Sequence, residues 1–159
     1  MRRSTITTLR ALIVLLLLGT LIVQAWIIPV LAGETASVYP EVSYLQVPFT
    51  VLAILVVLCF QLGLVCIWRL LSMVARDRIF STGAFRYVDA IVVALLVATA
   101  LLGGIDTYLT FVLHANPPLV ALLLAGGVVG GAALALLMVV MRGLLQKALR
   151  LESDLSEVI

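Results

Sequence analysis

Asp106 stands well inside a long apolar stretch, where its carboxyl group could support proton transfer or cation binding. An ionisable side chain within a membrane-spanning helix is costly and is by default a functional-site hypothesis. At helical spacing, Asp106 shares one broad face with Thr99, Gly103, Thr110 and His114. This face would line a small polar cleft in which Asp106 and His114 are the two titrating groups. The alternative is an aspartate close enough to the membrane surface to stay solvated, which avoids most of the cost, or one bonded to Thr or Tyr108 hydroxyls.

Two rows of glycines occupy another apolar stretch, at 125–132. Gly126 is followed four residues later by Gly130, and Gly127 by Gly131. Small residues at this spacing let two membrane helices approach closely, because no side chain separates their backbones. The rows therefore predict close helix packing, with either another helix of this chain or a second copy as the partner.

The other residues that could carry chemistry form no catalytic or metal-binding pattern. There is one histidine, and Cys59 and Cys66 lie seven residues apart on one helix face, where they cannot pair. Asp89 lies close to Arg86, and we expect it to pair with a basic neighbour. A glycine-rich phosphate loop, a nucleophile elbow and a zinc-protease helix are missing from the sequence. We therefore expect a non-enzymatic protein with no metal and no cofactor.

A basic segment at 76–81, Arg-Asp-Arg-Ile-Phe-Ser, separates two of the apolar stretches. Its arginines can lie among anionic lipid headgroups, where each contributes about 1 kcal/mol to membrane association. One interpretation is that the segment turns the chain sharply at the membrane surface. The other is that Arg76, Arg78 and Phe80 contact a protein partner.

The segment 142–159 has apolar side chains at helical spacing, and this pattern predicts an amphipathic helix that continues the last apolar stretch. Its apolar positions are Leu144, Ala148, Leu151, Leu155 and Val158. Basic residues come first in the segment, and the acids Glu152, Asp154 and Glu157 come last. The helix either packs against the basic segment or docks a cytoplasmic partner through its apolar stripe.

The composition explains why so few residues can carry chemistry. Of 159 residues, 64% are hydrophobic and 11% are charged, and the mean hydropathy is +1.29. A soluble domain carries about 25% charged residues, so this composition excludes a soluble globular enzyme and a disordered chain. The net charge of +2 is too small for direct nucleic-acid binding.

Four stretches contain the roughly 20 apolar residues that a helix needs to cross the hydrocarbon core. They lie at about 11–31, 47–68, 90–113 and 119–141. A cleavable signal peptide is the alternative for the first stretch, but its apolar run is long for one and its cleavage site is weak. We predict a single membrane domain over 1–159, an all-α integral membrane protein. The four stretches would form an antiparallel four-helix transmembrane bundle, followed by the amphipathic cytoplasmic C-terminal helix.

The basic residues predict the orientation of these helices. All ten Lys and Arg residues lie before the first stretch, between the second and third, or after the fourth. The other two connections, 32–46 and 114–118, contain none. Because cytoplasmic loops carry an excess of Lys and Arg, both termini and the middle connection are expected in the cytoplasm.

The chain resembles a family of small bacterial four-span membrane proteins, catalogued as domain of unknown function 2975, and within it an actinobacterial branch. The resemblance is carried by segments at 68–71 (Trp-Arg-Leu-Leu), 76–81, 88–91 (Val-Asp-Ala-Ile), 138–145 and 151–159. It implies four helices in the inner membrane of a bacterial cell, with no established activity and no assigned functional residues.

The leading hypothesis is a non-enzymatic membrane protein that acts as an accessory or regulatory partner through its cytoplasmic loop and tail. The first alternative is a small proton or cation transporter or pore that uses Asp106. The second is a structural subunit of a membrane assembly, which the glycine rows would suit. The expected partners are the lipid bilayer, a cytoplasmic protein and, through the glycine rows, a second copy of the chain.

Overall fold

The computed structural model describes residues 3–38, 40–74, 82–114 and 117–157. Every regular element in these ranges is helical, which confirms the all-α prediction. Helices suit apolar runs in lipid because they satisfy all backbone hydrogen bonds within one segment. In chain order the elements are α1 (Arg3–Ile22), the π-helical turn η1 (Val23–Ile27), α2 (Ile28–Val38), the 3₁₀ turn η2 (Pro40–Leu45), α3 (Gln46–Val74), α4 (Thr82–Phe111) and α5 (Pro118–Glu157).

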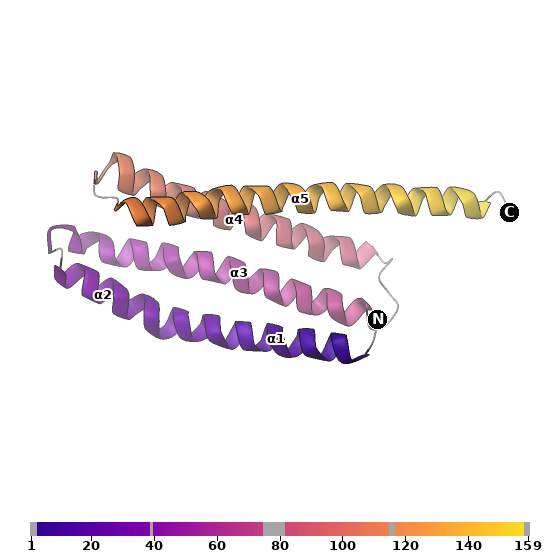
Figure 1. The fold of residues 1–159 in the computed structure, drawn as a ribbon, viewed down its shortest axis with the longest axis horizontal. Coiled ribbons are helices and arrows are strands. Elements are labelled where there is room, and N and C mark those ends of the chain that lie inside the picture. Colours follow the sequence, from indigo (N-terminus) through magenta and orange to yellow (C-terminus); the bar gives the residue numbers. More distant parts are fainter. Residues whose placement is uncertain (1–2, 39, 75–81, 115–116, 158–159) are drawn as a thin grey trace.

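The helices run antiparallel in a row that follows the order of the chain (Figure 1). α1 and α2 pack against α3, α3 packs against α4, and α4 packs against α5. The predicted four-helix bundle therefore takes the form of an open row, with α1 and α5 at its two edges.

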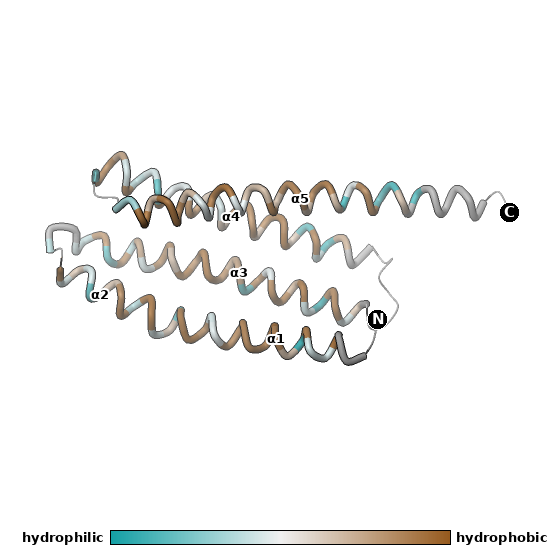
Figure 2. Tube along the Cα trace, in the orientation of Figure 1, coloured by the Kyte–Doolittle hydropathy of each residue, from teal (hydrophilic) through white to brown (hydrophobic). Residues whose placement is uncertain are grey.

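Four helices within the described ranges are long and apolar enough to cross a membrane, over Ile6–Val38, Ser43–Met73, Phe85–Phe111 and Pro118–Ala148. Apolar residues extend along the length of these helices (Figure 2). Large apolar side chains are exposed on them, for example Leu15 at 67% and Leu122 at 71%. A soluble monomer rarely exposes contiguous apolar patches above a few hundred Å², so this surface suits lipid.

The first spanning segment contains the π-helical turn η1, which ends at Ile27, two residues before Pro29. The Ile28 N–H donates to the Val23 carbonyl, five residues back. In a regular α-helix, the ring of Pro29 would clash with the carbonyl of Ala25. The wider turn accommodates that ring, and the helix continues to Val38, beyond the predicted limit at residue 31.

α5 is the longest helix, with 40 residues, which corresponds to about 60 Å at 1.5 Å per residue. It projects beyond the ends of the other helices (Figure 1). α5 continues without a break from the predicted span at 119–141 into the tail, through Glu157, in agreement with the helical continuation expected from the sequence.

A small buried cluster of Ile13, Leu64 and Leu71 joins α1 to α3. The residues that pack against it are Ile6, Leu17 and Trp68. The cluster lies toward the end of α3 that carries Arg69, and so it fixes the position of Trp68 there.

Candidate functional site at the basic end of the helices

Four arginines, one from each spanning segment, lie at the same end of the row, which we call the basic end. They are Arg10 on α1, Arg69 on α3, Arg86 on α4 and Arg142 on α5. The antiparallel arrangement is the cause, because the start of α1, the end of α3 and the start of α4 all lie at this end (Figure 1). The opposite end, which carries Glu34 and His114, is called the far end below.

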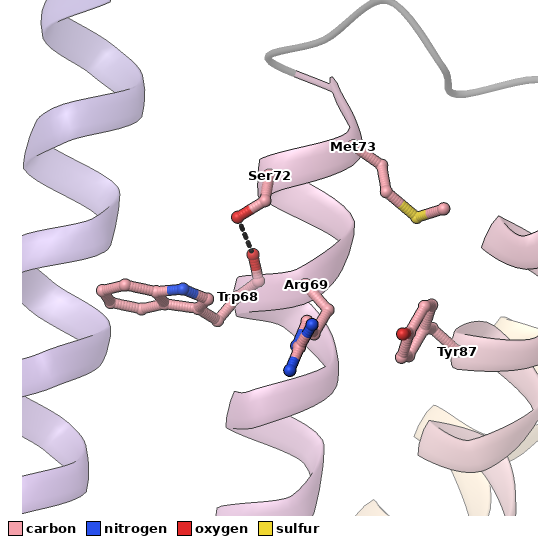
Figure 3. Close-up of a pocket in the computed structure, with 5 residues that line it drawn as sticks. All are labelled: Trp68, Arg69, Ser72, Met73 and Tyr87. Carbon is pink, nitrogen blue, oxygen red and sulfur yellow. Dashed lines mark hydrogen bonds between the residues drawn. The ribbon is translucent and has the colours of Figure 1, made fainter.

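A cavity of about 430 Å³ opens at the basic end between α3 and α4. Its lining residues are Trp68, Arg69, Ser72 and Met73 of α3 and Tyr87 of α4. In Figure 3, Met73 and Tyr87 face each other across the gap, and Arg69 lies on the same side of α3. Trp68 extends in the other direction, toward α1.

Arg10 approaches the cavity from the α1 side. Its Nη2 donates to Ser72 Oγ at 3.3 Å, and its guanidinium lies 5.9 Å from the centre of the Trp68 ring. Ser72 Oγ in turn donates to the Trp68 carbonyl at 3.0 Å (Figure 3). The Nε of Arg10 is buried and has no hydrogen-bond partner among the described residues. Among the described residues, Arg10 thus contacts neutral groups, and no described carboxylate pairs with its positive charge.

Arg142 and Asp89 form an ion pair that joins α5 to α4, with 2.6 Å between Nη1 and Oδ1. Asp89 does have a basic partner, but this partner comes from the next helix instead of from the nearby Arg86. Asp89 is the one carboxylate at the basic end whose side chain is described, and it is already engaged. No described carboxylate is therefore left there to neutralise Arg69.

The cavity combines hydrogen-bond donors with apolar walls. Arg69 supplies a guanidinium and Tyr87 a phenolic hydroxyl, whereas Met73 supplies apolar surface between the two helices. Such a set can hold an anionic group that is attached to an apolar body. This set is not predictable from the sequence, because its two walls are brought together only by the packing of α3 on α4. The sequence does contain two pairs of an aromatic and a basic residue, each next to an apolar stretch, and these could have indicated the site. They are Trp68-Arg69 and Arg86-Tyr87.

The face of α4 that contains Asp106 contacts α5 in its middle part. A Cβ added to Gly103 would lie 3.7 Å from Val128 Cγ2, and Thr99 lies against Gly131. Asp106 is half-buried and lines neither of the two cavities described for the structure. His114 is exposed beyond the end of α4, with a left-handed φ of +50°. The structure thus uses part of this face for helix packing.

The two glycine rows of α5 have different surroundings. A Cβ on Gly127 would lie 3.1 Å from Leu102 Cδ1 of α4, and one on Gly131 would clash with the Thr99 hydroxyl. A Cβ on Gly126 or Gly130 would meet nothing within 4 Å. The row of Gly127 and Gly131 therefore packs on α4, whereas the row of Gly126 and Gly130 faces away from the described helices.

A second cavity, of about 520 Å³, lies toward the far end and has walls from α2, α3, α4 and α5. Its lining is almost entirely apolar and includes Leu31, Phe49, Ala53, Leu102, Leu109 and Leu124. The nearby rings of Phe49 and Tyr108 are 5.9 Å apart. This cavity offers apolar surface and no charged side chain.

Six predicted partner-binding residues have no described side chains. Arg76, Arg78 and Phe80 lie outside the described ranges. Glu152, Asp154 and Glu157 lie on the projecting part of α5, where only the helical backbone is described.

Comparison with known proteins gives one match. The family model described as protein of unknown function (DUF2975) matches residues 30–159, which include α3, α4 and α5 in full. No curated protein and no solved structure matches the chain.

Proposed function

The chain belongs to the DUF2975 family of proteins of unknown function, and from that premise we propose that it is a non-enzymatic integral membrane protein that acts as an accessory or regulatory partner of a cytoplasmic protein. The observation that carries this proposal is α5, which runs without a break from the apolar row out past its basic end. A rigid helix of this kind can present a docking surface beyond the lipid headgroups.

The proposed orientation places the basic end of the row in the cytoplasm of a bacterial cell. It is supported by Arg10, Arg69, Arg86 and Arg142, which lie at this one end on four different helices. Positive side chains next to membrane helices are retained on the cytoplasmic side of the inner membrane. Both termini are then cytoplasmic.

The proposed docking surface combines the projecting part of α5 with the segment that joins α3 to α4. This segment contains Arg76, Arg78 and Phe80 and follows directly on the basic end of α3. The acids Glu152, Asp154 and Glu157 lie near the end of α5, farthest along the helix from its apolar span. A partner would therefore meet basic side chains near the membrane and acidic ones away from it.

The test is capture of a partner from native membranes. The full chain, tagged at its N-terminus so that the tail stays free, is purified in mild detergent, and co-purifying proteins are identified by mass spectrometry. A stoichiometric partner is expected. It should be lost when Glu152, Asp154 and Glu157 are changed together to Gln, Asn and Gln, because these changes remove charge and keep the helix.

Glu34→Gln is the matched control, since it removes a carboxylate at the far end. This variant should retain the partner. Deletion of residues 151–159 with full insertion in the membrane and unchanged capture would overturn the proposal, as would recovery of the parent protein without a partner.

A further inference from the structure

The cavity between α3 and α4 lies at the basic end of the apolar stretches, where the proposed membrane placement puts the lipid headgroups. Arg69 directly follows the apolar stretch of α3, and Tyr87 precedes that of α4. We propose that this cavity binds a phosphate group, held by the Arg69 guanidinium and the Tyr87 hydroxyl, and that the headgroup of an anionic phospholipid supplies it. The inference rests on the membrane placement proposed above and does not depend on a protein partner.

The two donors suit a phosphate in their chemistry. A guanidinium presents its N–H groups in a fixed planar fork that pairs with two phosphate oxygens at once. Tyr87 comes from the opposite wall and offers a third donor (Figure 3). Met73, which faces Tyr87 across the gap, provides apolar surface for the glycerol and the first carbons of the acyl chains (Figure 3). Basic pockets between membrane helices on the cytoplasmic side are known sites for anionic headgroups.

The charge balance of the basic end also favours an anion. Asp89 is occupied by Arg142, at 2.6 Å. Arg10 contacts the neutral Ser72 and Trp68, both of which line the cavity, and its buried Nε has no partner in the described part of the chain. A phosphate beside Arg69 would therefore add negative charge next to two arginines that no described carboxylate neutralises.

The volume suits one headgroup. A cavity of about 430 Å³ is at the small end of the range for ligand sites, roughly 300–1,000 Å³. Its α3 wall spans less than two helical turns, from Trp68 to Met73.

Trp68 provides a direct optical reporter, because the chain has two tryptophans and the other, Trp26, is 73% exposed on η1, well away from the basic end. In the Trp26→Phe variant, emission comes from Trp68 alone. This variant is reconstituted in phosphatidylcholine vesicles that contain one-fifth phosphatidylglycerol. Two vesicle preparations are compared, because brominated acyl chains quench tryptophan on contact. In one, the phosphatidylglycerol carries the brominated chains. In the other, an equal fraction of the phosphatidylcholine carries them.

Brominated phosphatidylglycerol is expected to quench Trp68 more strongly than brominated phosphatidylcholine. The expected preference is about fivefold, which corresponds to about 1 kcal/mol for one basic side chain at the surface. Arg69→Gln should reduce it to near one, and Tyr87→Phe should reduce it in part. Trp68→Phe, in which exposed Trp26 is the reporter, should show no preference.

Arg86→Gln is the matched control, because Arg86 is exposed at the same end and does not line the cavity. It removes the same charge and should keep the preference. An equal loss in both arginine variants would show general attraction to a positive surface and overturn the site, as would an unchanged preference in Arg69→Gln.

A competition experiment distinguishes a lipid headgroup from free phosphate as the ligand of this cavity. Inorganic phosphate at millimolar concentration and constant ionic strength should leave the preference unchanged. If it abolishes the preference, the same donors bind soluble phosphate and the lipid assignment is overturned. Deletion of residues 151–159 should not alter quenching, so failure of partner capture and failure of this site are separate results.

Discussion

The two edges of the helix row are held by different means. At one edge, α5 approaches α4 through residues with little or no side chain, Gly127, Gly131 and Ala135, the last of which is 2% exposed. At the other edge, α1 joins α3 through the bulky cluster of Ile13, Leu64 and Leu71 and through hydrogen bonds. Lipid tails are as apolar as leucine, so neither edge gains from a hydrophobic difference, and each must rely on close packing or polar contacts.

The difference predicts that the α4–α5 edge tolerates added volume poorly, whereas the α1–α3 edge is more sensitive to lost volume. At a glycine contact the backbones are close and have no side chain that can move aside. At the α1–α3 edge, interdigitating side chains provide the contact area, and their removal leaves a gap. The family match begins at residue 30. It therefore contains the α4–α5 edge in full and excludes α1.

The largest expected effect is that of one methyl group at the glycine edge. Gly131→Ala should lower the free energy of unfolding by about 1–3 kcal/mol, because its Cβ would meet the Thr99 side chain and force α5 away. The Thr99 hydroxyl donates to the Leu95 carbonyl at 2.8 Å, so its rotation away would break that bond. Reversible unfolding in mixed detergent micelles measures the change.

Gly130→Ala is the matched control, because the same methyl group there meets open space. It should be neutral or stabilising by up to about 1 kcal/mol, owing to the better helix propensity of alanine. Thr99→Ala should recover part of the stability lost in Gly131→Ala. Equal effects of the two glycine variants would contradict the assignment of the packed row.

The next effect tests the bulky edge by removing volume. Ile13→Ala should destabilise by about 1–2 kcal/mol, because Ile13 is 3% exposed and belongs to the cluster that joins α1 to α3. This is less than the 2–5 kcal/mol typical of water-soluble cores, because the transfer contribution is absent when the unfolded helix remains in lipid. Leu15→Ala, at a lipid-facing position of the same helix, should change the same unfolding measurement little. An equal loss in both variants would contradict the proposed edge.

This pair of residues also shows what the sequence could predict about the fold and what it could not. The four spans follow from the length of the apolar runs, and the antiparallel order follows from the short connections. The face of each helix that packs against its neighbours does not follow, because Ile13 and Leu15 are both large and apolar, yet Ile13 is buried and Leu15 is exposed. Hydrophobic periodicity identifies a buried face only where the opposite face is polar.

The same argument applies to the candidate sites. The glycine spacing predicts close approach in both rows, and Ala135 extends the row of Gly127 and Gly131, whereas Leu134 follows Gly130 in the other. Which helix the extended row contacts does not follow from this pattern, because it depends on the packing of α5 on α4. A basic partner for Asp89 is predictable from the composition of the basic end. Its identity as Arg142 is not, because it depends on the packing of α5 against α4.

The smallest expected effect concerns a single polar contact of the α1–α3 edge. Gln61 is 9% exposed, and its Nε2 donates to Thr20 Oγ1 at 3.3 Å. Gln61→Leu should cost about 0.6 kcal/mol, the average for such bonds between membrane helices. The cost is small because the Thr20 hydroxyl still donates to the Leu17 carbonyl at 2.9 Å, so no donor is left unsatisfied. A double-mutant cycle with Thr20→Val isolates the pair.

Gln24→Leu is the control for the direction of the stability change expected in Gln61→Leu. Gln24 lies in η1, one turn beyond Thr20, and its Oε1 is buried without a partner among the described residues. Removal of an unsatisfied buried acceptor relieves a desolvation cost, so Gln24→Leu should be neutral or stabilising. Opposite signs for the two glutamines would show that the α1–α3 edge depends on the bond itself. A loss of stability in both would instead indicate that the shape of each side chain matters more than its hydrogen bond.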